Sequence, residues 1–462
     1  MMVPDIRECS WWRPLTVALV GEPFDEAQKR LSDGLLATFE EEGHHIIHQP
    51  EKFPGRVDIM LTFHEIPQGD APLQDRIEER HWPLALHLKR EFGLEKRPEN
   101  LITFVTISES LREMPHLEVV EIARIAMTRI GTPKVIFITG EPGSGRVEEV
   151  TLCTMEGGHP TISGDDWPYL LRDLSNRLVA LACAQEVGGR YRVIKDALSR
   201  EDWLSSSIPD DLIEAGHRMD QLDLLPPLLE LSQWVSPSLA RVYERFMNMK
   251  HFSEGMLCAW EPELNLMMVT GSGSWGVDKR HLEREDVVPI GEVSEGSILV
   301  YAPEGMATKG PSVETREFFE AFLRAPTVRL RKVGKAWRID PDGPVEAPLI
   351  RSIIHAHVGI IDVDDRLVEW VPTNREKFPY PFGCGTDLMM DVTLDALSRS
   401  NALHDPDDPR AVVLWNFENH GIAAAELWKG EPREHAIQLT LDMFDPEAVG
   451  AIRYTPDRIV QV

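Results

Sequence analysis

The chain of 462 residues is long enough for two or three domains, and its 42% apolar residues suffice for ordinary globular cores. Its 48 basic against 76 acidic residues give a net charge of −28, which argues against nucleic acid and anionic membranes as general partners because both require phosphate neutralisation. The five cysteines show no CxxC spacing, as is typical of reduced thiols, and neither a secretory leader nor a membrane-spanning apolar run is apparent. We therefore expect a cytoplasmic protein.

The first part of the chain alternates short apolar strands with amphipathic helices. Strands are predicted at residues 15–21, 57–63, 101–107 and 134–139, with helices between them at 24–42, 75–92 and 118–130. This order indicates an α/β fold, and we assign residues 1–160 to a doubly wound, Rossmann-like domain with a parallel sheet. The first strand–helix turn, Gly21-Glu22-Pro23, lacks the spaced glycines of dinucleotide-binding folds, so no NAD is expected.

A glycine-rich loop at residues 140–146, Gly-Glu-Pro-Gly-Ser-Gly-Arg, resembles the phosphate loop of nucleotide hydrolases. Arg146 and Val147 stand where that motif requires Lys and then Ser or Thr. Residues 147–155 alternate like a second strand, which favours a β-hairpin loop with glycines at positive φ. We expect no ATP, and a nucleotide hydrolase is kept only as a third alternative.

The rest of the chain divides by its predicted elements. Residues 161–250 read mainly as helices and form a predicted helical middle segment. Beyond residue 250 short strands separated by proline and glycine turns dominate, so residues 251–462 are assigned to a strand-rich mixed α/β domain.

Glu261 and Glu263 are the first candidate catalytic pair. In an extended strand, residues i and i+2 share a face, so the two carboxylates would converge, and one pKa would rise as acid–base catalysis requires. They would equally suit a hard cation. Pro262 between them weakens the strand prediction, and a solvated hairpin corner is the alternative.

Two further pairs with the same spacing contain histidine. His355 and His357 lie in the apolar sequence IIHAHVGII, where a strand would place both imidazoles on one face. Glu418 and His420 follow the apolar run 412–417, at a strand end. Imidazole and carboxylate on adjacent strands are ligands for a divalent metal such as Mn²⁺ or Zn²⁺. The alternative is ordinary histidines that hydrogen-bond to carbonyls or water.

Other candidates concern substrate binding. Cys384, Thr386 and Asp387 open a predicted helix, where free backbone N–H groups suit an anionic or sugar-like group, although Thr386 or Asp387 as a plain N-cap is the simpler interpretation. His64 and Glu65 follow an apolar strand, at the edge where doubly wound sheets bind ligands.

An α/β start with the sequence VALVGEPFDEAQKRL, a helical middle and a strand-rich end carrying Glu261, Glu263 and His420 resembles the L-fucose and L-arabinose isomerase superfamily. The resemblance implies a Mn²⁺-dependent aldose–ketose isomerase acting on a small, sugar-like substrate. Glu261 and Glu263 would then bind the metal or transfer the proton, and His355, His357 and His420 would complete the coordination.

A non-catalytic ligand-binding or assembly protein is the competing class. In that case these side chains are ordinary surface and core groups, and Trp11, Trp12 and Trp260 would mediate subunit contacts. A homo-oligomer is therefore possible in either class.

Overall fold

The computed structural model describes residues 3–53, 55–93, 100–141, 143–154, 159–184, 187–226, 228–247, 251–252, 254–273, 276–294, 296–380, 383–417 and 420–456. The chain forms two compact units, one made of residues 1–184 and 231–246 and the other of 185–230 and 247–462. Among the described residues, no helix combines the length and apolar composition needed to cross a membrane.

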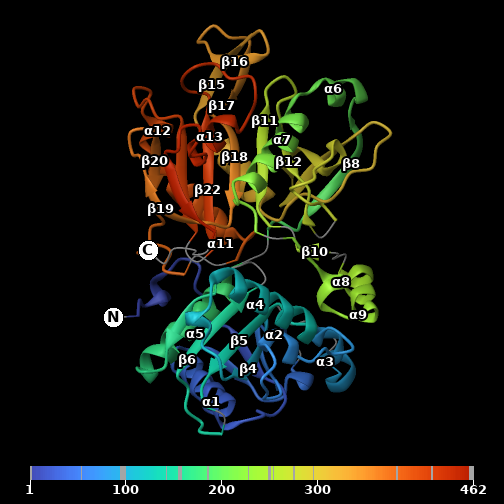
Figure 1. The fold of residues 1–462 in the computed structure, drawn as a ribbon, viewed down its shortest axis with the longest axis vertical. Helices are drawn as coiled ribbons and strands as arrows, with labels where there is room; N and C mark the ends of the chain where they lie inside the picture. Colours follow the sequence, from blue (N-terminus) through green and yellow to red (C-terminus); the bar gives the residue numbers. More distant parts are fainter. Residues whose placement is uncertain are drawn as a thin grey trace. The chain divides into compact units, whose positions relative to one another are not determined.

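The first unit contains a seven-stranded sheet in the order β2-β1-β3-β4-β5-β6-β7 (Figure 1). Its strands are β1 (Thr16–Leu19), β2 (His45–Ile47), β3 (Ile59–His64), β4 (Asn100–Ile107), β5 (Lys134–Thr139), β6 (Glu149–Thr154) and β7 (Thr161–Ser163). The first five are parallel, and their order is that of doubly wound sheets. The predicted α/β class and N-terminal parallel sheet are confirmed.

The helices of the first unit cover both faces of this sheet. They are α1 (Glu26–Glu41), α2 (Leu73–Arg76), α3 (Leu84–Phe92), α4 (His116–Ile130), α5 (Trp167–Cys183), α8 (Leu231–Trp234) and α9 (Pro237–Val242), with short turns at Ile6–Glu8, Pro50–Lys52, Leu111–Glu113 and Tyr243–Met247. The crossovers from β1 to β2 and from β3 to β4 run in opposite directions along the sheet. Right-handed crossovers therefore place α1 on one face, with α5 packed against it, and α3 and α4 on the other.

The glycine-rich loop after β5 joins two antiparallel strands. β5 and β6 pair from Lys134 opposite Thr154 to Thr139 opposite Glu149, and the Glu148 amide donates to the Thr139 carbonyl. The predicted hairpin is confirmed, and only the residue at 142 in the loop lies outside the described part.

The second unit is built on a nine-stranded, mostly antiparallel sheet in the order β20-β21-β22-β18-β11-β12-β13-β14-β8 (Figure 1). These strands are β8 (Tyr191–Leu198), β11 (Met256–Glu261), β12 (Leu266–Thr270), β13 (Val287–Ser294), β14 (Ser297–Pro303), β18 (Ile350–Ala356), β20 (Val368–Val371), β21 (Val412–Phe417) and β22 (Gly421–Leu427). Smaller sheets are formed by β15 (Thr327–Val333), β16 (Ala336–Ile339) and β17 (Val345–Pro348), by β19 (Gly359–Val363) and β23 (Ile452–Thr455), and by β9 (Leu229–Glu230) and β10 (His251–Phe252).

Helices pack on both faces of the central sheet as well. They are α6 (Arg200–Ser205), α7 (Ile208–Gln221), α10 (Thr315–Arg324), α11 (Asp387–Ser398), α12 (Asn401–His404) and α13 (Gln438–Phe444), with a short turn at Arg284–Asp286. Alternate strand residues, among them Leu257 and Ile354, join a core with α7 and α13. The intervening residues face α10 and α11, as the stacking of Trp260 on Phe319 shows.

The two units divide the chain differently from the three predicted segments. The predicted helical middle, 161–250, contributes α5, α8 and α9 to the first unit and β8, α6, α7 and β9 to the second. A periodicity reading detects the helices, but it carries no information on which sheet each helix covers.

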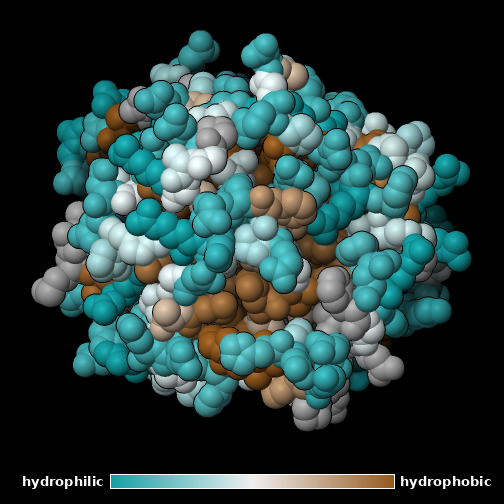
Figure 2. Space-filling view, turned by 90° about the horizontal axis from the view of Figure 1, so that it is seen from below, coloured by the Kyte–Doolittle hydropathy of each residue, from teal (hydrophilic) through white to brown (hydrophobic). Residues whose placement is uncertain are grey.

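The three tryptophans proposed as contact residues differ in their side-chain exposure. Trp260 is 3% exposed and packs against α10, so it offers no surface, whereas Trp11 and Trp12 are partly exposed. The face in Figure 2 is mostly hydrophilic around a smaller group of apolar side chains, in keeping with the acidic composition.

Candidate metal centre

Strand β18 carries the first histidine of the candidate site. Ile354 faces the core beneath α7 and α13, so the alternation of side chains turns His355 to the opposite face, where its ring lies beside Phe318 of α10. His357 follows the end of the strand, and its side chain returns to the same place. The predicted sharing of one face by His355 and His357 matches this geometry.

His420 enters from the turn of the β21–β22 hairpin. Its amide donates to the Phe417 carbonyl, which closes the turn. Gly421 has a φ of +143°, and a Cβ there would stand 2.4 Å from the Ala356 carbonyl oxygen. Only glycine therefore lets the hairpin approach the end of β18 so closely, and this approach brings His420 against the other two rings.

The three imidazoles converge through their Nε2 atoms. His355 Nε2 lies 3.0 Å from His357 Nε2 and 3.2 Å from His420 Nε2, and the ring centroids are 4.6 to 5.0 Å apart. Tetrahedral Zn²⁺ with Zn–N bonds of about 2.0–2.1 Å separates its nitrogen ligands by about 3.3 Å. The rings thus already stand at nearly the spacing of ligands around one small cation.

The opposite ring nitrogens are held by acceptors. His355 Nδ1 lies 2.8 Å from the Ile422 carbonyl oxygen, and His357 Nδ1 lies 2.6 Å from a carboxylate oxygen of Glu254. A carbonyl or carboxylate can only accept, so both Nδ1 atoms carry the proton. Metal-ligating histidines are oriented in the same way, by a carboxylate or carbonyl at the remote nitrogen.

This tautomer assignment makes the short nitrogen contact informative. Burial lowers the pKa of His355, against the opposing effect of the Glu314 charge. The Nε2 atoms of His355 and His357 lie 3.0 Å apart, so one ring donates a hydrogen bond to the other where one Nε2 atom carries a proton. Where both rings are neutral and protonated at Nδ1, their Nε2 lone pairs face each other, and a metal ion between them would remove the repulsion.

Glu314 is a buried carboxylate beside the histidines. It accepts hydrogen bonds from the Ser312 hydroxyl and, at 2.8 Å, from the Cys384 thiol. Burial alone would raise the pKa of Glu314, but the His355 imidazole, these hydrogen bonds and the Lys279 ammonium together bring it below its usual value. Glu314 is therefore an ionised carboxylate in a largely dry environment.

Lys279 is a second buried charge at this place. Its side chain is 2% exposed, and burial lowers its pKa to about 8, although the charge of Glu314 acts in the opposite direction. Buried groups with perturbed pKa values gather at functional sites, and Lys279 and Glu314 supply one cation and one anion close to the three imidazoles.

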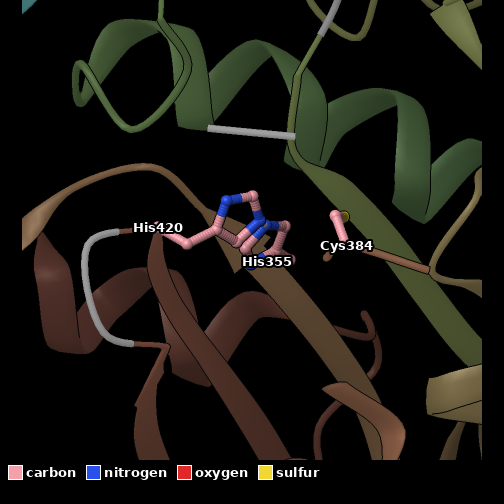
Figure 3. A group of neighbouring side chains, drawn as sticks. All are labelled: His355, Cys384 and His420. Atoms are coloured by element: carbon pink, nitrogen blue, oxygen red, sulfur yellow. Dashed lines mark hydrogen bonds between the residues drawn. The ribbon is translucent and has the colours of Figure 1, made fainter. Parts of the chain in front are cut away.

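Cys384 belongs to the same group of side chains. Its Sγ atom and the ring nitrogens of His355 and His420 all lie within 4.8 Å of one another, and these three residues could hold a metal ion. Figure 3 shows the two imidazoles side by side, with Cys384 reaching them from a separate segment of the chain. This His-Cys-His group could therefore hold a metal ion.

Glu261 and Glu263 do not join this group. Glu261 ends β11, is 5% exposed and accepts a hydrogen bond from Ser206, whereas Glu263 lies in the turn and pairs with Lys332 at 2.8 Å. Met256, five residues before Glu261, is the strand residue opposite His355, which puts Glu261 about 17 Å further along the strand. The predicted convergence is corrected because Pro262 ends the strand and separates the two side chains.

The other predicted residues have varied positions. Thr386 caps α11 by accepting from the Met389 amide, and Asp387 is the first residue of that helix, as the plain N-cap interpretation expects.

His64 and Glu65 stand at the carboxyl end of β3 in the first unit, where Arg80 lies 3.1 Å from His64 Nδ1. They belong to a different unit from the histidine group. Glu418 lies outside the described residues.

Sequence reasoning missed Glu254, Lys279 and Glu314. Glu314 had a usable signal, because it stands four residues before Phe318 and so falls on the apolar face of a helix otherwise rich in phenylalanine. An acid on a buried helical face requires a partner. Glu254 and Lys279 lie in irregular segments, and no periodicity marks them.

No protein-family model and no curated protein matches this chain.

Proposed function

We propose that this protein is a divalent-metal-dependent enzyme that removes a proton from the carbon next to the carbonyl of a small hydroxy-carbonyl, sugar-like compound. The observation that carries the proposal is the convergence of three imidazole Nε2 atoms, at 3.0 and 3.2 Å, beside the buried carboxylate of Glu314. Aldose–ketose isomerisation is the reaction that we favour within this class.

The cation would supply one kind of chemistry. Held by three imidazoles, it would keep a fourth position open and act as a Lewis acid on a carbonyl oxygen, stabilising the negative charge that proton removal leaves there. Glu254 and the Ile422 carbonyl hold the rings of His357 and His355 in the ligating tautomer.

Glu314 is the general base in this proposal. The imidazole and hydrogen bonds around it hold its pKa below the usual value, so it is ionised and present in the form that can accept a proton. Lys279 balances its charge from within the same buried region. This role replaces the one expected for Glu261 and Glu263, which lie at the other end of β11.

Burial indicates the side from which a substrate would approach. His355, His420 and Glu314 are each no more than 6% exposed, whereas Cys384 and His357 are partly exposed. Among the described groups, the approach is therefore from the side of Cys384 and His357. A compact ligand with vicinal oxygen atoms would meet the metal and Glu314 together.

Metal binding is tested first. The purified protein is stripped with a chelator and titrated with Zn²⁺ and Mn²⁺ by calorimetry, and one ion per chain is expected. A chain that binds neither ion more tightly than about millimolar overturns the metal centre.

The proton transfer is tested with dihydroxyacetone in D₂O. The metal-loaded protein should exchange its carbon-bound hydrogens for deuterium, as followed by NMR. Glu314→Gln should reduce this exchange at least about 100-fold while the metal stays bound, because general bases contribute on this order. Glu317→Gln, three residues along and hydrogen-bonded to Thr393, is the matched control and should keep the exchange.

Two outcomes contradict this proposal. A tightly bound metal without exchange of dihydroxyacetone or glycolaldehyde hydrogens favours a non-catalytic metal protein. Exchange that survives in Glu314→Gln removes Glu314 as the base.

A further inference from the structure

We propose that Cys384 is a fourth protein ligand of the cation, which the substrate displaces, and that its thiolate makes the site selective for Zn²⁺ over Mn²⁺ and Mg²⁺. This inference rests on the metal centre of the proposed function and adds a ligand, a metal identity and a means of regulation to it.

The position of the sulfur supports ligation. Cys384 Sγ lies within 4.8 Å of the ring nitrogens of both His355 and His420. In a tetrahedral Zn²⁺ site with Zn–S of about 2.3 Å, sulfur and nitrogen ligands stand about 3.6 Å apart. A displacement of about 1 Å, within reach of a side-chain rotation, closes that difference.

The loop that carries Cys384 is built to hold it there. Gly383 and Gly385 have φ values of +94° and +72°, and a Cβ on Gly385 would stand 2.7 Å from the Val313 carbonyl oxygen. The Gly385 carbonyl accepts hydrogen bonds from the amides of Val187 and Gly188 at 3.0 and 2.9 Å. The loop is thus anchored against residue 313, which places the thiol beside Glu314.

Glu314 accounts for the thiol proton. The Cys384 S–H donates to Glu314 Oε1 at 2.8 Å. On metal binding the S–H bond would break, the sulfur lone pair would bond the metal, and the proton would pass by way of Glu314 to water. When a substrate oxygen takes the place of sulfur at the metal, the thiolate would take up a proton from water and again donate a hydrogen bond to Glu314. No oxidant or other reactant is needed.

This exchange couples substrate entry to catalysis. Without substrate the sulfur would fill the fourth position, so the centre would be closed to a substrate oxygen. A thiolate also favours Zn²⁺ and Co²⁺, whereas carboxylate and water ligands suit Mg²⁺ and Mn²⁺. The Mn²⁺ implied by the sugar-isomerase resemblance is therefore replaced by Zn²⁺.

Cobalt substitution tests the ligand directly. Co²⁺ added to the metal-free full-length protein should give a sulfur-to-cobalt charge-transfer band in the near ultraviolet, with one equivalent bound. Cys384→Ser should lose the band, and Cys9→Ser, the same change at a cysteine of the first unit, should retain it. Dihydroxyacetone should weaken the band as it displaces sulfur.

A second measurement covers the case in which Cys384→Ser does not fold. X-ray absorption of the Zn²⁺-loaded wild-type protein should count one sulfur among its ligands. Where the variant folds, its Zn²⁺ affinity should fall at least about tenfold, with little change for Mn²⁺.

The failures are distinguishable. Co²⁺ bound without a sulfur band, or Zn²⁺ without a sulfur ligand, overturns the role of Cys384 and leaves the three-histidine centre intact. A wild-type protein that binds neither ion overturns the centre and, with it, the proposed function.

Discussion

His420 occupies a hairpin turn, so its side chain can be removed with little loss of the surrounding structure. We expect His420→Ala to lower Zn²⁺ affinity at least about tenfold, because one of three imidazole ligands is lost. His404→Ala removes a histidine of the same unit that lies 3.2 Å from the Leu397 carbonyl, and should leave the affinity unchanged.

Calorimetry of both variants with Zn²⁺ makes the comparison. A structural histidine would behave differently, since its truncation costs about 1–3 kcal/mol of stability through an unsatisfied partner and leaves metal binding as it was. Equal Zn²⁺ affinity with a lower melting temperature in His420→Ala would remove this residue from the centre.

Glu317 gives a prediction about pH. Burial, with the nearby charge of Glu314, raises its pKa from 4.5 to about 8 against the opposing Thr393 hydrogen bond, so the folded protein keeps a proton that the unfolded chain releases above pH 4.5. The stability that this group contributes is complete below pH 4.5 and is lost as pH rises towards 8, by about 1.4 kcal/mol per pH unit.

Glu317→Gln cannot ionise and should lack this dependence. Chemical denaturation of the metal-free protein between pH 5 and 8 should show wild type losing stability relative to Glu317→Gln as pH rises. Glu320→Gln, on the same helix and paired with Arg324, is the control and should follow wild type. Parallel pH curves for wild type and Glu317→Gln would show that Glu317 is ionised in the fold.

Site residues could be predicted from the sequence where residues with suitable side chains are two positions apart in a strand. His355 and His357 share a face because strand geometry has a period of two, and this is readable without coordinates. The same rule failed at Glu261 and Glu263, where Pro262 ends the strand. Glu314 was missed because its partners Lys279 and Cys384 lie about 35 and 70 residues away in the chain. Local sequence patterns do not indicate contacts over such separations.

At the scale of elements, the site depends on how closely the β21–β22 hairpin approaches β18. Gly421→Ala places a Cβ 2.4 Å from the Ala356 carbonyl oxygen and 3.0 Å from the His357 Cα, so the strands must separate. We expect a loss of stability of about 1–3 kcal/mol from overpacking, together with weaker Zn²⁺ binding, because His420 moves with the hairpin.

Gly334→Ala is a control that separates the cost of backbone strain from the cost of steric crowding. Gly334 also has a positive φ, +65°, but a Cβ there would meet no atom within 4 Å. Its substitution should cost about 1 kcal/mol through backbone conformation alone and leave Zn²⁺ affinity unchanged. Chemical denaturation gives the stability of both variants, and calorimetry gives their Zn²⁺ affinity. An unchanged Zn²⁺ affinity in Gly421→Ala would show that the position of the metal ligands does not depend on the spacing between the hairpin and β18.

Elements with regular patterns were predictable, and exposed edge elements were not. The parallel strands of the first unit are buried on both faces and read as apolar runs, which sequence reasoning detected. β8 is exposed along most of its length, so it carries no apolar alternation, and it was absorbed into the predicted helical middle. Yet β8 pairs with β14 and begins the second unit.

At the scale of the whole molecule, the chain passes between its two units more than once. Residues 231–246 return to the first unit, where the Tyr243 hydroxyl donates to the Thr128 carbonyl at 2.6 Å and Arg129 donates to the Trp234 carbonyl at 2.7 Å. The predicted segments were divided by their expected helices and strands, which carry no information on these crossings. Tertiary hydrogen bonds of this kind, more than 100 residues apart, decide the assignment.

This organisation predicts where a bound metal acts. The proposed ligands His355, His357, His420 and Cys384 all belong to the second unit, so Zn²⁺ at 100 times its Kd should stabilise that unit by about 2.7 kcal/mol through mass action. Hydrogen exchange with and without Zn²⁺ should therefore show slower exchange in peptides from β18 and β22. Peptides from β4 and β5 of the first unit should be unchanged.

His420→Ala serves as the control for this measurement, because an ion bound elsewhere would protect the same peptides in the variant. Equal protection of both units by Zn²⁺ would contradict an ion held by the second unit alone. If protection is confined to β18 and β22 and is lost in His420→Ala, then Zn²⁺ binds at the strand ends around the three imidazoles and stabilises them. The most strongly protected amides should then be those of Ile422 and Gly421, since the Ile422 carbonyl holds the His355 ring and Gly421 holds the hairpin against β18.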